Sequence, residues 1–137
     1  MILLGMSANG QKEAAKKVIS GLVRSSDHFE YERLPELFCG YDESIGKPVK
    51  YPVACSPQAW AAGSPLVFIQ SLLGLFPDSL NKRIILSPTL LDDMNFLSVS
   101  DISIGEGFLS ISVTRTEQGN NVAIEKNTTG FEVVHKK

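Results

Sequence analysis

A carboxylate in a proline-stiffened, aromatic-rich segment is the strongest candidate for chemistry in this sequence. Glu36 lies between Pro35 and Leu37, within the segment from Arg33 to Asp42. A carboxylate held rigidly beside aromatic side chains can act as a general base on water, and sugar rings stack on aromatic faces. The other interpretation is a surface glutamate that pairs with Arg33 or with solvent. The residue type alone leaves both interpretations open.

A second group of polar and aromatic residues follows a polar loop tip. Gln58 and Trp60 stand at the start of an apolar helical segment, and Tyr51 precedes them. From the first turn of that helix, Gln58 and Trp60 could face the same space as Glu36. The alternative for Trp60 is packing in the core, since a helix that is apolar on all sides is normally buried.

Length and composition restrict the class of protein. The chain of 137 residues suits one domain, or one domain with a small appendage. Hydrophobic residues make up 43% and charged residues 20%, as in a folded globular protein, and the net charge of -2 argues against a nucleic-acid partner. The apolar run over 66–76 is shorter than the roughly 20 residues that cross a bilayer. We therefore expect a cytoplasmic protein without a membrane partner.

The sequence contains no glycine-rich phosphate loop, and its two cysteines do not match a zinc-binding spacing. No cofactor or metal is therefore expected. Cys39 and Cys55 are expected to be reduced thiols, although a disulfide between them stays open.

The N-terminal part is expected to be helical. Residues 1–6 are apolar and lack a capping residue, so they are typical of the end of a helix, and Gln11–Ser25 has the periodicity of an amphipathic helix. A long irregular connection over 29–57 follows, and connections of this length are usually functional. Ser56 and Pro57 have the types of a helix cap and first position, and Pro65 predicts a kink in the helix that follows.

From Lys82 onward the apolar residues alternate with a period of two, which predicts strands. The alternation changes phase near Ser100 and Asp101, which predicts a β-bulge. Turns are expected at 105–107 and 118–121. The sequence therefore predicts a helical part over 1–80 and an antiparallel meander or small sandwich over 81–137.

Two segments together carry a resemblance to a known family. The segment Arg33-Leu-Pro-Glu-Leu-Phe-Cys-Gly-Tyr-Asp42 and the later Tyr51-Pro-Val-Ala-Cys-Ser-Pro-Gln-Ala-Trp60 resemble the C-terminal end of glycogen debranching enzyme-related proteins. These are the amylo-alpha-1,6-glucosidase group of glycoside hydrolases. The resemblance covers roughly residues 1–78, and the strand region fits the small C-terminal β appendage of the family without a distinctive motif.

The resemblance implies a fold, an activity and a site. The fold would be α+β, with N-terminal helical hairpins of an (α/α)6 toroid followed by the β appendage. Glu36 would be the general base of an inverting α-1,6-glucosidase acting on an α-glucan or oligosaccharide. Gln58, Trp60, Arg33 and Tyr51 would line the glucose subsite.

An inverting glycosidase also needs a general acid, with the two carboxyl groups about 6.5–9.5 Å apart. In the family this acid comes from a helical hairpin upstream, and Asp27, Asp42 and Glu43 do not match it. The chain therefore resembles a C-terminal fragment, which we expect to be inactive alone and to need the missing N-terminal part. The alternative is a non-catalytic remnant that binds glycan or other partners. Because its apolar helical faces have lost their neighbours, we expect a homo-oligomer.

Overall fold

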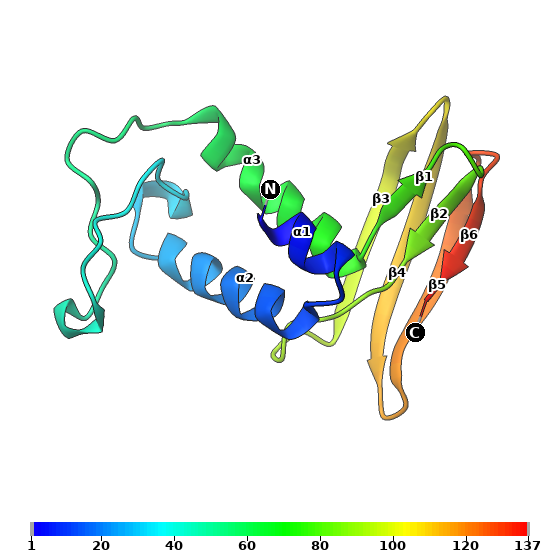
Figure 1. Cartoon of the computed structure of the whole chain (residues 1–137), viewed down its shortest axis with the longest axis horizontal. Helices are drawn as coiled ribbons and strands as arrows, with labels where there is room; N and C mark the ends of the chain where they lie inside the picture. Colours follow the sequence, from blue (N-terminus) through cyan, green and yellow to red (C-terminus); the bar gives the residue numbers. More distant parts are fainter. Residues whose placement is uncertain (1, 137) are drawn as a thin grey trace.

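The computed structural model describes residues 2–136 and contains three helices and two small sheets. The helices and the long connection lie on one side of the molecule, and the strands stand on the other (Figure 1). The helices are α1 (Ile2–Ala8), α2 (Lys12–Ser26) and α3 (Ala59–Leu73). The strands are β1 (Phe76–Asp78), β2 (Arg83–Leu86), β3 (Phe96–Ile104), β4 (Gly107–Thr116), β5 (Gly119–Asn127) and β6 (Glu132–His135).

Helix α2 confirms the predicted amphipathic helix to within one residue at each end. Its buried side chains are Ala15 and Ile19, four residues apart on one face. The N-terminal apolar segment is also helical, as α1, and Gly10 follows it with a φ of 71°. That left-handed conformation favours glycine, and it turns the chain from α1 into α2.

The predicted start of the third helix is wrong. Ser56 and Pro57 precede α3, and the cap is Gln58, whose side-chain oxygen accepts a hydrogen bond from the Ala59 N–H at 2.9 Å. The helix ends at Gly74, which has a φ of 56°. A Cβ at Gly74 would lie 2.3 Å from the carbonyl oxygen of Ser87, so only glycine fits there.

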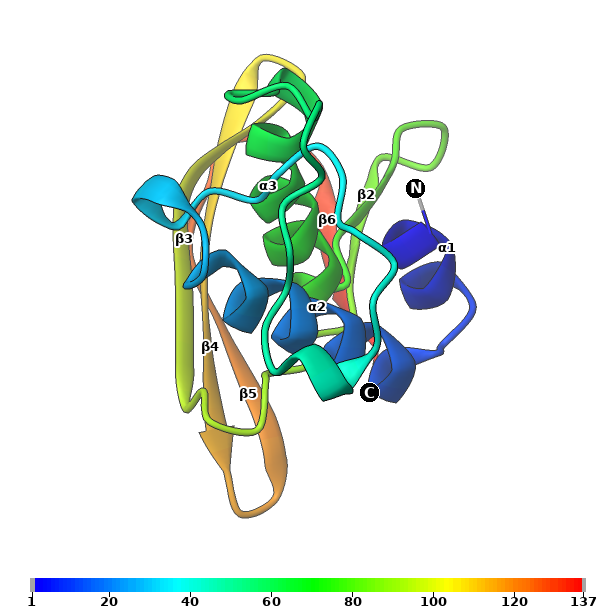
Figure 2. The ribbon, with the colours of Figure 1, turned by 90° about the vertical axis from the view of Figure 1, so that its left-hand side faces the viewer.

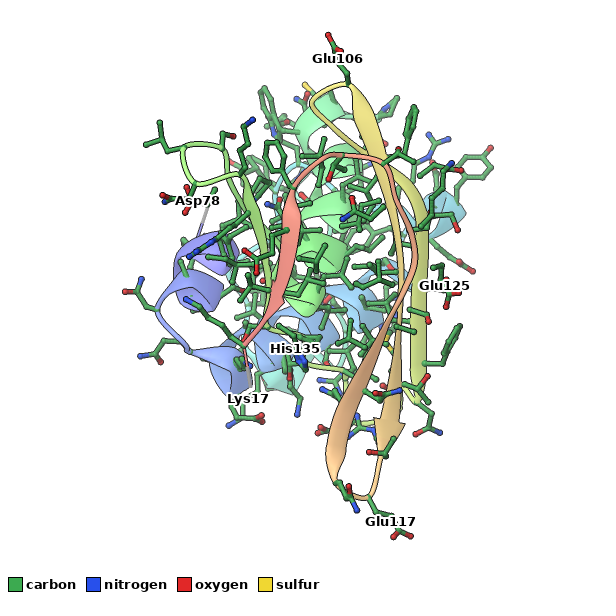
Figure 3. All side chains as sticks on the ribbon, turned by 90° about the vertical axis from the view of Figure 1, so that its right-hand side faces the viewer. Lys17, Asp78, Glu106, Glu117, Glu125 and His135 are labelled. Carbon is green, nitrogen blue, oxygen red and sulfur yellow. The ribbon has the colours of Figure 1, made fainter. Side chains whose placement is uncertain are left out.

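The strands form two three-stranded sheets. The sheet β3–β4–β5 is an antiparallel meander, and its register shifts between Val99 and Ile102, which confirms the predicted bulge. The second sheet has the order β1–β2–β6. Strands β2 and β6 are parallel, so the prediction of a wholly antiparallel β part is wrong. Figure 3 shows Glu106 and Glu117 at the opposite tips of the long meander.

Two apolar cores meet at the C-terminal half of α3. Leu73 belongs to the core that the two sheets share, with Ile84, Leu109 and Ile111. The preceding residue, Leu72, belongs to the core between the helices. Leu72 and Leu73, which are adjacent in α3, therefore connect the core of the helices to the core of the sheets.

The expected (α/α)6 architecture is wrong for this chain. A toroid of six hairpins needs a ring of paired helices, but within residues 2–136 there are three helices, and α1 contacts both α2 and α3. Apolar residues of α1 and the strand region, Leu3 and Leu91, complete the helical core. The fold is a mixed α+β arrangement with a helical N-terminal part.

That residues 1–80 and 81–137 are separate parts of the fold stays a prediction. The last helix ends at Leu73, and the first strand begins at Phe76. None of the helices in residues 2–136 is long and apolar enough to cross a membrane.

Candidate functional site

The connection between α2 and α3 encloses the larger of two cavities described below. It crosses in front of both helices when the molecule is viewed from that side (Figure 2). The cavity has a volume of about 820 Å³. Its polar and charged lining consists of Ser26, His28, Glu30, Glu32, Arg33, Lys47, Lys50, Cys55, Ser56 and Gln58.

Local contacts give the connection its shape. Phe38 and Lys50 form an isolated antiparallel bridge, and the Cys39 N–H donates to the Val49 carbonyl at 2.9 Å. The Phe38 ring packs edge-on against Phe29, with 5.5 Å between the ring centroids. These contacts join the chain on either side of residues 40–48 into a stem, defined here as residues 38–50.

Glu36 does not itself line this cavity, but its carboxylate is bound to a residue that does. Its Oε2 atom accepts a hydrogen bond of 2.8 Å from the Cys55 N–H, 19 residues later in the chain. Pro35 and Cys55 both line the cavity, and the Glu36 side chain is half-buried. Its second oxygen, Oε1, accepts no hydrogen bond from a described residue, so it is free to accept one from a water or a hydroxyl.

Arg33 and Gln58, two of the predicted subsite residues, line the cavity. The guanidinium carbon of Arg33 lies 5.0 Å from the centroid of the Tyr31 ring, a distance at which a cation is attracted to an aromatic face. The Gln58 oxygen is occupied by the Ala59 N–H, which leaves its NH₂ group available to a ligand. The structure therefore brings Arg33 and Gln58 together with the neighbours of Glu36.

Trp60 and Tyr51 are placed differently from Arg33 and Gln58. The Trp60 side chain is 68% exposed and that of Tyr51 is 41% exposed, and neither lines the cavity. The aromatic walls are Phe29 and Phe68 instead. Trp60 is thus neither packed in a core nor part of the cavity wall, and its exposure leaves it free to contact a larger ligand or another protein surface.

Several charged lining residues were missed by the sequence analysis. Glu30 and Glu32 lie in a short turn, where Tyr31 and Glu32 have φ values of 57° and 54°. Left-handed conformations are unfavourable for such residues, and backbone strain of this kind gathers at functional sites. Lys47 and Lys50 come from the stem. Only the length and aromatic content of the connection gave a sequence signal for them.

The cavity lining carries charges of both signs. Its carboxylates are Glu30 and Glu32, and its cations are Arg33, Lys47 and Lys50. Such a mixture of donors and acceptors suits a neutral ligand with many hydroxyl groups. Cys39 and Cys55 are free thiols, and no group of three potential metal ligands occurs within residues 2–136.

No protein-family model matches the chain, and no curated protein is similar enough to be recognised as a relative.

Proposed function

We propose that the large cavity binds an α-glucan and that Glu36 serves as the general base of a debranching-type glycoside hydrolase. The observation that carries the proposal is the hydrogen bond between Glu36 Oε2 and the Cys55 N–H at the cavity rim. It orients the carboxylate and leaves Oε1 without a protein donor. A general base needs this arrangement, because one oxygen must be free to take a proton from water.

The lining supports a carbohydrate ligand. Arg33 and the free NH₂ group of Gln58 can donate to sugar hydroxyls, and Glu30 and Glu32 can accept from them. The rings of Phe29 and Phe68 offer apolar surface to the C–H face of a sugar. The volume of about 820 Å³ is within the range of small-molecule sites.

Hydrolysis with inversion needs a second carboxyl group on the other side of the sugar. The family resemblance assigns that group to an upstream segment, so we propose that this chain binds glucan but releases no glucose until such a segment associates with it.

Calorimetric titration with a linear malto-oligosaccharide and with an α-1,6-branched one tests the binding. We expect saturable binding that weakens about tenfold in Arg33→Ala, because one charge-assisted hydrogen bond is lost. Arg83→Ala is the matched control, since Arg83 is an exposed arginine of β2 that pairs with Glu132. Absence of saturable binding to either oligosaccharide, or equal weakening by both substitutions, would contradict the proposal.

A non-catalytic interaction module is the second candidate, and the exposed face of α3 favours it. This helix has no charged residue, and its side chains Trp60 and Leu66 are 68% and 71% exposed. An exposed apolar face tends to be covered by association, here with a second copy or with the upstream segment.

Light scattering at micromolar concentration distinguishes an oligomer from a monomer. An oligomer that dissociates in Leu66→Ser supports self-association, whereas a strictly monomeric wild type excludes it. Glucose release that is abolished by Glu36→Gln excludes the non-catalytic candidate.

A further inference from the structure

A second cavity adjoins the first and shares the lining residues His28, Lys47 and Pro48 with it. It has a volume of about 660 Å³ and lies between the C-terminal half of α2 and the stem. In Figure 1 the tip of the stem lies at the far left, beyond the end of α2 where the connection begins. His28 and Lys47 line both cavities, whereas Arg24, Phe38 and Tyr41 line only this one.

Positive charge gathers around the second cavity. Arg24 comes from the last turn of α2, His28 from the turn that follows the helix, and Lys47 from the stem. Among the side chains that the structure describes, which do not include that of Glu43, none forms an ion pair with these three. Lys16, Arg83 and Lys126, in contrast, are engaged by carboxylates.

One carboxylate, that of Asp42, also lines this cavity. Its Oδ1 atom accepts a 2.9 Å hydrogen bond from the Ser44 N–H, and bonding to Ser44 lowers the Asp42 pKa. Asp42 is therefore charged at neutral pH and is occupied within the stem. Among the described side chains of the lining, the cations Arg24 and Lys47 outnumber the carboxylate of Asp42 by one charge.

The helix wall of the cavity is open at Gly21. A glycine inside a helix lowers stability by about 0.5–1 kcal/mol relative to alanine, so the presence of glycine at position 21 needs an explanation. Close packing is not the reason, because a Cβ at Gly21 would have no atom within 4 Å. Gly21 lines the cavity, so its missing side chain leaves backbone accessible to a ligand.

The opposite wall is aromatic and held in place. Phe38 packs on Phe29 and pairs with Lys50, and the Tyr41 side chain is 64% exposed beside it. Aromatic surface accepts the flat face of a ring, while arginine and lysine donate hydrogen bonds to the oxygens of a phosphate group.

We propose that the second cavity binds a small phosphate monoester carried on a ring, with Arg24 and Lys47 holding the phosphate and the Phe38–Tyr41 wall holding the ring. A sugar phosphate and a nucleoside monophosphate share this chemistry. The proposal does not rest on glucan binding, since Arg24 and the aromatic wall are absent from the lining of the first cavity.

The proposal is tested by titrating the full chain with four probes and monitoring its amide NMR signals. The probes are glucose 6-phosphate, AMP, inorganic phosphate and glucose. We expect saturable shifts at residues 21–28 and 38–47 with at least one of the two esters, which should bind about tenfold more tightly than inorganic phosphate because the ring adds contact. The tighter ester identifies the ring. Equal affinity for glucose and its phosphate, no saturable shift with either ester, or no preference for the esters over phosphate would overturn the proposal.

Two substitutions sharpen the test. Arg24→Gln should weaken ester binding about tenfold and leave malto-oligosaccharide binding unchanged, because Arg24 lies outside the first cavity. Lys17→Gln is the matched control, since it removes the same charge from an exposed position of α2 outside both cavities. Equal effects of the two substitutions would show non-specific charge attraction and would overturn the site. Failure of glucan binding with intact ester binding would affect only the proposed function.

Discussion

The β3–β4–β5 sheet and the connection between α2 and α3 are held together in different ways. In the sheet, Leu109, Ile111 and Val113 are at most 1% exposed and form one continuous core with the second sheet. In residues 27–58, every residue whose burial is described is exposed or half-buried. The connection is ordered by a few hydrogen bonds and ring contacts instead. The candidate site therefore lies in the connection, which has no fully buried residue among those described, whereas the sheets supply most of the apolar burial.

The largest expected effect is a loss of stability from a substitution in the sheet, because the sheet buries more apolar surface than the connection does. Ile111→Ala should lower the free energy of unfolding by about 2–5 kcal/mol, because it leaves a cavity in a fully buried position. Leu37→Ala should lower it by under about 0.5 kcal/mol, because the Leu37 side chain in the connection is 49% exposed. Urea denaturation measures both. Similar losses at the two positions would show that the connection has a core of its own.

The next largest effect on stability is expected at Gly74, where α3 leads into the sheets. Gly74→Ala should destabilise by more than about 1 kcal/mol, because Gly74 has a positive φ and a Cβ there would collide with the Ser87 carbonyl. Gly63→Ala is the matched control. A Cβ at Gly63, inside α3, would meet no atom within 4 Å, so alanine should stabilise by about 0.5–1 kcal/mol. Thermal denaturation of both variants tests the difference, and a stabilised Gly74→Ala would contradict it.

Within the connection, the contact between Glu36 and Cys55 predicts a local effect. Glu36→Ala removes the acceptor of the Cys55 N–H, so hydrogen exchange at that amide should become faster. Glu36→Gln keeps an oxygen acceptor and should leave the exchange rate nearly unchanged. Global stability should change by about 1 kcal/mol or less in both. Equal exchange in the wild type and Glu36→Ala would show that the contact does not fix the loop.

The smallest effect concerns an ion pair between α2 and the segment after β2, in which the Lys16 side chain is partly buried and the Asp92 side chain is exposed. Lys16 Nζ lies 2.6 Å from Asp92 Oδ1, and the hydrogen bond from Lys16 lowers the Asp92 pKa below 3.8. The hydrogen bond to Asp92 likewise raises the Lys16 pKa above 10.5. The pair therefore stabilises the fold between these limits. Its contribution is lost as pH falls through the lowered Asp92 pKa or rises through the raised Lys16 pKa.

Asp92→Asn tests this pH dependence. The variant should be slightly less stable than the wild type at neutral pH, and the difference should disappear well below pH 3.8. Denaturant titrations at the two pH values measure it. A difference that persists in acid would point to packing or hydrogen bonding of Asp92 in place of its charge.

The features that could be predicted from sequence were the locally determined ones. The period of three to four residues identified α2, and the change of phase at Ser100 and Asp101 identified the bulge in β3. Local signals were less reliable at α3, where Ser56 and Pro57 resemble a helix start but the Gln58 side chain provides the cap. In each confirmed case, residues close in sequence determine the structure.

Features that depend on distant contacts could not be predicted. The parallel pairing of β2 with β6 joins residues such as Ile84 and Val133, and no periodicity signals such a pairing. The expected toroid was taken from a resemblance in the connection, but the contacts of α1, α2 and α3 determine the fold of this chain. The candidate site was predicted in part for the same reason. Arg33 and Gln58 line the cavity as predicted, while Lys47 and Lys50 join them only through tertiary folding.

Amide NMR with a malto-oligosaccharide tests the central claim, that the cavity beside Glu36 is a sugar site, most directly. We predict saturable shifts at residues 30–36 and 55–62, the segments that carry Glu36 and line the cavity, with little change in the β3–β4–β5 sheet. Arg33→Ala should weaken the response. Shifts confined to the sheet, or no saturable shift beside Glu36, would contradict the claim.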